Sequence, residues 1–159
     1  GMKGSGKDEN KRAPMYWNKD GNAEGMCKGP ADMDDFRMKF DSLEEQQEDP
    51  DSIYNYVKQV IRVRNQNPVI ARGTTAYLEQ YSGEQCFALT RSYEGSNLLL
   101  LGNTSAEAVS VDLTGLTVGG TTAEELVLLG ELYTGEETAE RAGTVVTLPA
   151  YSILILGEE

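Results

Sequence analysis

The spacing of apolar residues changes once along this chain, and the change limits what the chain can fold into. Between residues 53 and 64, apolar side chains recur every third or fourth position, which is the period of one helix face. From Gly73 onward the period becomes two, and polar turn residues interrupt the pattern about every eight to twelve positions. Short strands with such turns are typical of an antiparallel sandwich or barrel. We therefore expect a mainly β fold that is preceded by one α-helix.

The helix is expected over residues 49–66. Asp49 can accept hydrogen bonds from the free amides of the first turn, and Pro50 suits the first helical position. Asn67 and Pro68 then end the helix. Its apolar stripe includes Ile53, Val57, Val60 and Ile61. This stripe has to pack on the sandwich, on residues 1–48 or on a second copy of the chain, which would make a homo-oligomer.

Seven strands are expected after Gly73, over residues 74–80, 86–92, 97–103, 108–113, 125–129, 144–148 and 152–156. The segments 98–101 and 153–156 are continuous apolar runs, so they should form central strands. Residues 108–113 alternate between apolar and polar side chains, as on a half-exposed strand. Residues 18–48 are rich in glycine and charge, and they predict a long irregular N-terminal segment.

The charge of the chain is strongly and unevenly negative. The net charge is −12, and residues 73–159 contain thirteen Asp and Glu against two arginines, Arg91 and Arg141. Such a surface repels phosphate backbones, which argues against a nucleic-acid partner. Its ordinary interpretation is a solubilising acidic face. No apolar run reaches the length of a membrane span, so no membrane partner is expected.

The residue types needed for most metal and nucleophilic chemistry are scarce. The chain has no histidine, which removes the commonest zinc ligand and the usual base of a nucleophilic triad. Residues 18–24 alternate like calcium ligands but lack the glycine and glutamate positions of a calcium loop. Cys27 and Cys86 do not make a disulfide framework, which slightly favours a cytoplasmic location. Asp8 and Glu9 are sequence neighbours, and such carboxylates on a loop rarely face each other across a glycosidic bond, so we expect them to form salt bridges or order the loop. We expect no cofactor, no metal and no catalytic residue.

The first seventeen residues contain Gly-Met-x-Gly, followed by Asp-x-x-x-Arg-x-Pro-Met-x-Trp from Asp8 to Trp17. This run resembles the loop after the eighth barrel strand of the α-amylase superfamily, glycoside hydrolase family 13. Residues 46–52 and 61–68 read Gln-x-x-Asp-Pro-x-Ser and Ile-x-x-Arg-x-x-Asn-Pro, and they resemble the start and end of the last barrel helix. Beyond Gly73 the expected strands resemble domain C, the antiparallel β-sandwich that follows the barrel.

The resemblance implies that this chain is a C-terminal fragment of a retaining α-amylase or α-glucosidase-like enzyme. Residues 1–72 would be the remnant of the catalytic β/α barrel, and residues 73–159 would be domain C. The family's catalytic carboxylates follow the fourth, fifth and seventh barrel strands, upstream of this sequence, so the chain alone is expected to be inactive. Its implied partners are the missing barrel and, in the parent enzyme, an α-glucan oligosaccharide. Lys7 and Arg12 are the basic residues of the loop that would border the sugar pocket.

Two alternatives of other classes stay open. The sandwich could be a carbohydrate-binding module, whose stacking platforms would come from its tyrosines, Tyr77, Tyr81, Tyr93, Tyr133 and Tyr151. The chain could also be a stand-alone structural or interaction domain.

Overall fold

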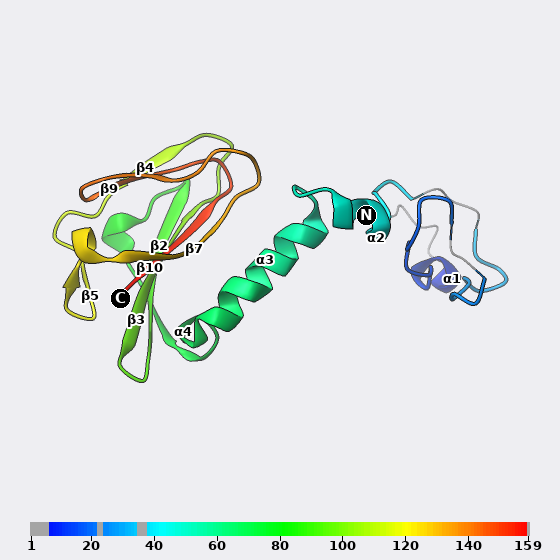
Figure 1. Ribbon diagram of the computed structural model, residues 1–159, viewed down its shortest axis with the longest axis horizontal. Helices are drawn as coiled ribbons and strands as arrows, with labels where there is room; N and C mark the ends of the chain where they lie inside the picture. The colour runs from blue at the N-terminus through cyan, green and yellow to red at the C-terminus, as the bar shows by residue number, and fades with distance from the viewer. Residues whose placement is uncertain (1–6, 22–23, 35–37, 159) are drawn as a thin grey trace. The chain divides into compact units, whose positions relative to one another are not determined.

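The structure is a computed structural model that describes residues 7–21, 24–34 and 38–158 (Figure 1). The chain divides into two compact units, residues 1–55 and residues 56–159. The expected division after residue 72 is of another kind, because it separates the part that resembles the barrel from the part that resembles domain C. It stays a prediction. Within the described residues the helices are α1 (Asp8–Lys11), α2 (Leu43–Glu48), α3 (Ile53–Gln66) and α4 (Pro68–Arg72).

The first unit contains two short helices that sequence analysis missed, α1 and α2. Ser42 begins α2 with a capping box, in which its hydroxyl accepts a hydrogen bond from the Glu45 amide and the Glu45 carboxylate accepts one from the Ser42 amide. The pattern Ser-x-x-Glu at residues 42–45 could have predicted this helix.

The expected main helix begins later than predicted. Its first residue is Ile53, and Asp49 is the C-cap of α2 rather than the N-cap of α3. The Asp49 carboxylate accepts a hydrogen bond from the Asp51 amide at 3.0 Å, and the Ser52 hydroxyl accepts one from the Asn55 amide at 3.2 Å. Ser52 therefore has the capping role that was expected of Asp49. Asp49 lies at the end of α2, whose start is fixed by the capping box at Ser42.

The second unit is an antiparallel β-sandwich, which confirms the expected fold class (Figure 1). One layer is a five-stranded sheet in the order β1-β2-β3-β10-β7, built from Thr74–Tyr77, Cys86–Tyr93, Ser96–Asn103, Ile153–Gly157 and Val127–Leu132. The other layer is a three-stranded sheet in the order β4-β9-β8, built from Val109–Asp112, Val145–Leu148 and Glu140–Ala142. A small hairpin pairs β5 (Thr117–Val118) with β6 (Thr121–Thr122), and two short 3-10 helices are η1 (Glu79–Tyr81) and η2 (Ala123–Glu125).

Both faces of the five-stranded sheet are covered. Leu99 and Leu101 of β3 point into the core between the two sheets, which they share with Val146 of β9. Leu98 and Leu100, on the opposite face of β3, pack with residues of α3 and α4. Because successive side chains of a strand point to opposite faces, burial of both faces requires an uninterrupted apolar run. The predicted central position of residues 98–101 is confirmed, and residues 153–156 of β10 follow the same rule.

A glycine lets α3 come close to the sheet. A Cβ atom placed on Gly130 of β7 would lie 2.7 Å from a methyl carbon of Val63. Val63 is the buried residue of α3, and Val60 packs beside it in the same cluster. The absence of a side chain at residue 130 is therefore a requirement of this helix–sheet contact.

The helix packs on the sandwich with only part of its apolar surface. Val60 and Val63 face the sheet, whereas Ile53, Val57 and Ile61 have exposed fractions of 77 %, 46 % and 52 %. Within this single chain these three side chains are therefore not fully covered, and their coverage by a second copy stays a prediction. Since the apolar residues cover a wider arc than one partner can bury, the outward part of the helix remains open.

Candidate functional site

The first expected site residue, Lys7, belongs to a small polar cluster in the first unit. Its ammonium group donates a hydrogen bond to one carboxylate oxygen of Asp34 at 2.8 Å. The side-chain amide of Asn10 donates to the other oxygen at 2.8 Å, and the Asp34 amide donates back to Asn10 at 3.0 Å. The hydrogen bond to Asp34 and the charge of that carboxylate raise the pKa of Lys7 above its usual value. This cluster joins α1 to the loop around residue 34.

The second expected site residue, Arg12, pairs with a different carboxylate. Its guanidinium group donates to Asp8, one turn away on α1. The side chains of both residues are about two-thirds exposed, so the pair contributes little to stability. The structure thus gives Lys7 and Arg12 separate acidic partners. The Gly-Met-x-Gly part of the same motif lies in residues 1–6, outside the described residues.

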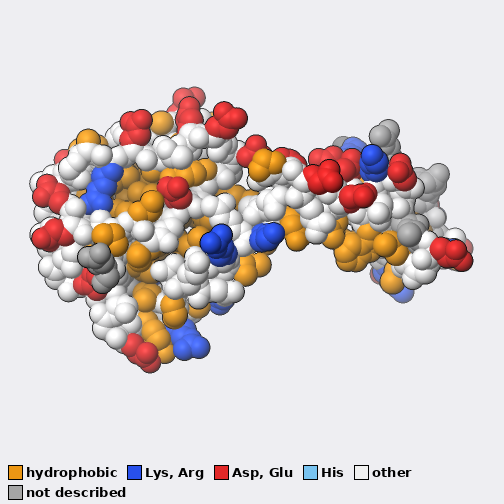
Figure 2. Space-filling view, in the orientation of Figure 1, with side chains coloured by type: hydrophobic (Ala, Val, Ile, Leu, Met, Phe, Trp, Pro, Cys, Tyr) orange, Lys and Arg blue, Asp and Glu red, His pale blue; other side chains and the backbone are white. Residues whose placement is uncertain are grey.

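The first unit buries polar side chains and exposes apolar ones. Among its described residues, the buried side chains are those of Asn10, Ser42 and Ser52. Its exposed large apolar side chains, in contrast, include Met15, Trp17, Met26 and Phe40. Figure 2 shows apolar side chains gathered on one face of this unit. An apolar surface of this kind marks a contact with another protein segment or a ligand.

The described residues have neither a metal-binding cluster nor a membrane-spanning helix. They contain no group of three or more Cys, Asp and Glu that could hold a metal ion. None of their helices is long and apolar enough to cross a lipid bilayer.

Three of the five tyrosines of the sandwich contact other groups of the chain through hydrogen bonds or a cation, and the other two are exposed. Tyr81 is buried and donates a hydrogen bond to the Thr114 carbonyl at 3.2 Å. Tyr133 bonds Glu131 and the Ala139 amide, and the Arg72 guanidinium lies over the Tyr93 ring, 5.9 Å from its centre. The remaining two, Tyr77 and Tyr151, are more than half exposed. Only these two are suited to stacking on a ligand.

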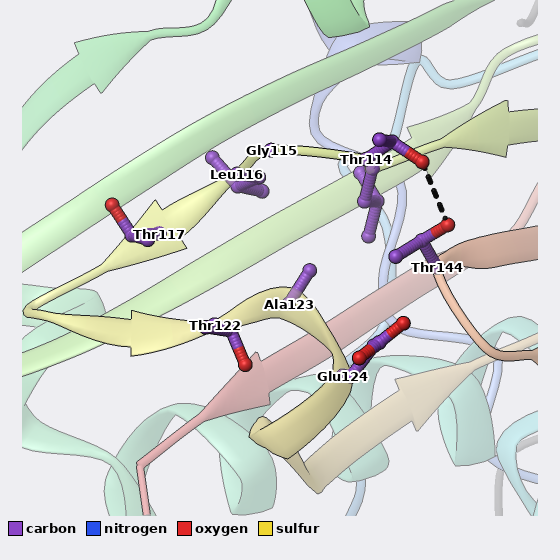
Figure 3. Close-up of a pocket in the computed structure, with 9 residues that line it drawn as sticks. Thr114, Gly115, Leu116, Thr117, Thr122, Ala123, Glu124 and Thr144 are labelled. Carbon is purple, nitrogen blue, oxygen red and sulfur yellow. Dashed lines mark hydrogen bonds between the residues drawn. The ribbon is translucent and has the colours of Figure 1, made fainter.

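A hollow of about 310 Å³ lies beside the β5–β6 hairpin and is rich in threonine (Figure 3). The hydroxyls of Thr114 and Thr144 point toward each other at 3.0 Å, and both donate to the carboxylate of Asp112, which lowers the pKa of that carboxyl. The Thr122 hydroxyl is bonded to Glu125. Most polar groups here already have partners within the sandwich, so the hollow is part of the packing of the hairpin.

Comparison with known proteins identifies the fold. No family model matches the sequence, and no curated protein sequence matches it. Among solved structures, Amy13B of Eubacterium rectale is 38 % identical, with a TM-score of 0.85 over 99 % of this chain and 29 % of that chain. The α-amylase from H. orenii is 22 % identical, with a TM-score of 0.64 over 92 % of this chain and 28 % of that chain. The trehalulose synthase MutB from Pseudomonas mesoacidophila MX-45 is 24 % identical, with a TM-score of 0.67 over 92 % of this chain and 25 % of that chain.

The second and third of these similarities concern the fold alone, and together with the first they define the sandwich as one of the amylase C-terminal type. The chain belongs to the α-amylase superfamily, glycoside hydrolase family 13, as its motifs predicted. It spans less than a third of the length of each of these three structures.

Proposed function

We propose that this chain is the non-catalytic C-terminal part of a retaining glycoside hydrolase that acts on α-glucosidic bonds. The similarity to Amy13B extends over 99 % of this chain but 29 % of that one, which leaves room for a catalytic barrel in the parent protein. The other similar structures include an α-amylase and trehalulose synthases, all of which share this fold. In this proposal the sandwich stabilises the barrel, and the barrel supplies the catalytic carboxylates.

The observation that carries the proposal is the reversed burial of the first unit. Four of its large apolar side chains, those of Met15, Trp17, Met26 and Phe40, are exposed while its fully buried side chains are polar, which is the opposite of a self-sufficient core. The outward residues of α3, Val57 and Ile61, add a second apolar surface. A barrel of the same polypeptide would cover surfaces of this kind, and each side chain of this size contributes about 1.5–3 kcal/mol when fully buried.

Lys7 and Arg12 would border the sugar pocket in the intact enzyme. Their acidic partners, Asp34 and Asp8, come from the same unit and hold the two basic groups in place before a barrel is present. Arg12 has the planar fork that can bond two oxygen atoms at once, whereas Lys7 supplies a single mobile charge. We therefore expect Arg12 to contribute more than Lys7 to any contact with sugar or with a barrel carboxylate.

The first experiment measures activity. The purified 159-residue chain is incubated with maltooligosaccharides and with an aryl α-glucoside, in parallel with the protein encoded by the full reading frame. We expect no turnover above the buffer blank for the chain and hydrolysis with retention for the full protein. Turnover by the chain that survives repurification would contradict the non-catalytic role. A full protein with no activity on α-glucosides would contradict the substrate class.

The second experiment tests the contact with the barrel. Val57→Ser and Ile61→Ser are introduced together, first into the 159-residue chain and then into the full protein. In the chain the change should leave the unfolding temperature nearly unaltered, because both side chains are already exposed. In the full protein it should lower the unfolding temperature by several degrees, since it places hydroxyls in a buried contact. Equal effects in both proteins would argue against burial of this stripe by a barrel.

A further inference from the structure

The outward stripe of α3, formed by Val57 and Ile61, continues into a charged side chain. Arg64 follows Ile61 by three residues, and Ile61 follows Val57 by four, so the three side chains lie along one face of the helix. All three are exposed in this chain. The surface that we assign to a contact with the barrel therefore ends in a guanidinium group.

Arg64 differs from most arginines of the second unit, which bond to groups of the chain itself. Arg91 donates to three oxygen atoms at the junction of α4 and β1. Arg141 donates to three carbonyl groups, and Arg72 lies over an aromatic ring. In contrast, Arg62 and Arg64 of α3 make no hydrogen bond, ion pair or cation–π contact with another described residue.

The helix itself offers Arg64 no counter-charge. From Ile53 to Gln66 it contains Lys58, Arg62 and Arg64 but no Asp or Glu, so no ion pair can form between its turns. Arg64 lies in the last turn, where a positive charge interacts favourably with the helix dipole. A lysine would serve that role as well, so the dipole alone does not require an arginine in line with the apolar stripe.

A surface that covers Val57 and Ile61 also removes water from Arg64, because the three side chains share one face. The guanidinium group keeps its proton under all ordinary conditions, and burial of an unpaired charge is costly. The covering surface therefore has to supply an acceptor. The planar fork of arginine matches the two oxygen atoms of a carboxylate, so an Asp or Glu is the acceptor that fits best.

A second copy of this chain does not supply that carboxylate through the same stripe. A symmetric dimer would place α3 against α3 of the other copy, and this helix has cations but no carboxylate to offer. A barrel of the same polypeptide has no such restriction. The similarity to Amy13B covers 29 % of that chain, which leaves most of a protein of that length outside this one.

We propose that the barrel segment that packs on α3 presents an apolar surface to Val57 and Ile61 and one Asp or Glu to Arg64, with which Arg64 forms a buried ion pair. The identity of the covering segment rests on the proposed function, whereas the need for a carboxylate rests on Arg64 itself. The pair would set where the covering segment lies along α3, because apolar contacts alone leave neighbouring positions similar in energy.

The test compares Arg64→Met with the matched control Arg62→Met, both in the 159-residue chain and in the protein encoded by the full reading frame. Each change removes one positive charge from α3 and keeps a long side chain of good helix propensity. Arg64→Met should lower the unfolding temperature of the full protein by several degrees, because it leaves a buried carboxylate unpaired. It should alter that of the 159-residue chain only slightly, and Arg62→Met should have a slight effect in both proteins.

A second set of variants identifies the carboxylate. Each Asp and Glu of the barrel is changed singly to Asn or Gln in the full protein that carries Arg64→Met. One of these changes should restore most of the lost unfolding temperature, because it removes the unpaired charge. Arg64→Lys should lose less than Arg64→Met, since it keeps the charge but not the fork, and it replaces Arg64→Met if that variant does not fold.

Three results would overturn the inference. An equal loss with Arg62→Met, or no loss with Arg64→Met, removes the ion pair, and a loss that no carboxylate change restores removes the carboxylate. A dimer of the full protein that Arg64→Met dissociates, seen by light scattering, assigns the stripe to a second copy. Each of these leaves the proposed function intact if the unaltered full protein hydrolyses α-glucosides, whereas absence of that hydrolysis counts against the proposed function and not against the pair.

Discussion

The two compact units of this chain use opposite arrangements of polar and apolar residues. In the second unit the buried side chains are mainly aliphatic, and Leu99, Leu101 and Val146 have no measurable exposure. In the first unit the buried described side chains are Asn10 and two serines, and hydrogen bonds rather than apolar contacts hold the loops. Since apolar burial is the main favourable contribution to folding, the second unit has a core that stabilises it, whereas the described residues of the first unit bury no large apolar side chain completely.

The largest expected effect comes from truncating the core of the second unit. Leu101→Ala removes a fully buried side chain between the two sheets, and it should lower the free energy of unfolding by about 2–5 kcal/mol. Urea unfolding followed by circular dichroism measures the change. The control is Phe40→Ala in the first unit, where the ring is 58 % exposed and little loss is expected. Comparable losses for both changes would break the contrast between the units.

The next effect tests the close approach of α3 to the sheet. Gly130→Ala places a methyl group 2.7 Å from a carbon of Val63, and overpacking of this kind should cost about 1–3 kcal/mol of stability. Adding Val63→Ala to the same chain should recover part of that loss, because the clashing methyl groups are gone. Gly135→Ala is the matched control, since no atom lies within 4 Å of the Cβ that it adds. No recovery in the double variant would show that the glycine serves another purpose.

A smaller effect is expected in the first unit. Ser42→Ala removes the hydroxyl of the capping box and should destabilise α2 by about 1 kcal/mol. Amide hydrogen exchange should become faster over residues 43–48 and stay unchanged in β3 and β10. Slower folding or faster exchange in the sandwich strands would mean that the two units unfold together rather than separately.

The smallest effect concerns alkaline pH. Burial, followed by the hydrogen bond to Glu131, raises the pKa of Tyr133 to about 12 from its usual 10.0. The folded chain thus holds this proton more tightly than the unfolded chain, so its stabilising contribution is complete below about pH 10 and is lost as the pH rises toward 12. Unfolding free energies measured from about pH 9 to about pH 11.5 should fall less steeply for Tyr133→Phe than for the unaltered chain.

Sequence reasoning located the parts of the fold that depend on local pattern. The continuous runs at 98–101 and 153–156 predicted central strands, because burial of both faces leaves no polar position in a strand. The strand expected over 125–129 begins later, as β7 over Val127–Leu132. Residues 123–125 form η2 instead, because Thr122 and Glu125 make a capping box at its start. The two-residue strands β5 and β6 and the three-residue strand β8 are too short for a period of two to be visible.

The candidate sites were harder to predict, because they depend on which side chains are left without partners. The five tyrosines of the sandwich are equivalent in the sequence, and only the structure separates Tyr77 from the hydrogen-bonded Tyr81 and Tyr133. The same holds for the helix, whose apolar arc includes both the residues that meet the sheet and those that face outward. The spacing of the apolar residues does not show which of them contact the sheet and which face outward.

The cover that α3 and α4 provide over the outer face of the five-stranded sheet has a consequence for recombining this sandwich with other proteins. A graft that started at Gly73, where the first strand region begins, would leave Leu98, Leu100 and Ile155 without Val63 and Val69 above them. The uncovered apolar face of the sheet would then be prone to self-association. A transplantable module has to carry the helical segment from Tyr56 onward, so the natural cutting point lies inside a helix rather than in the turn between helix and strand.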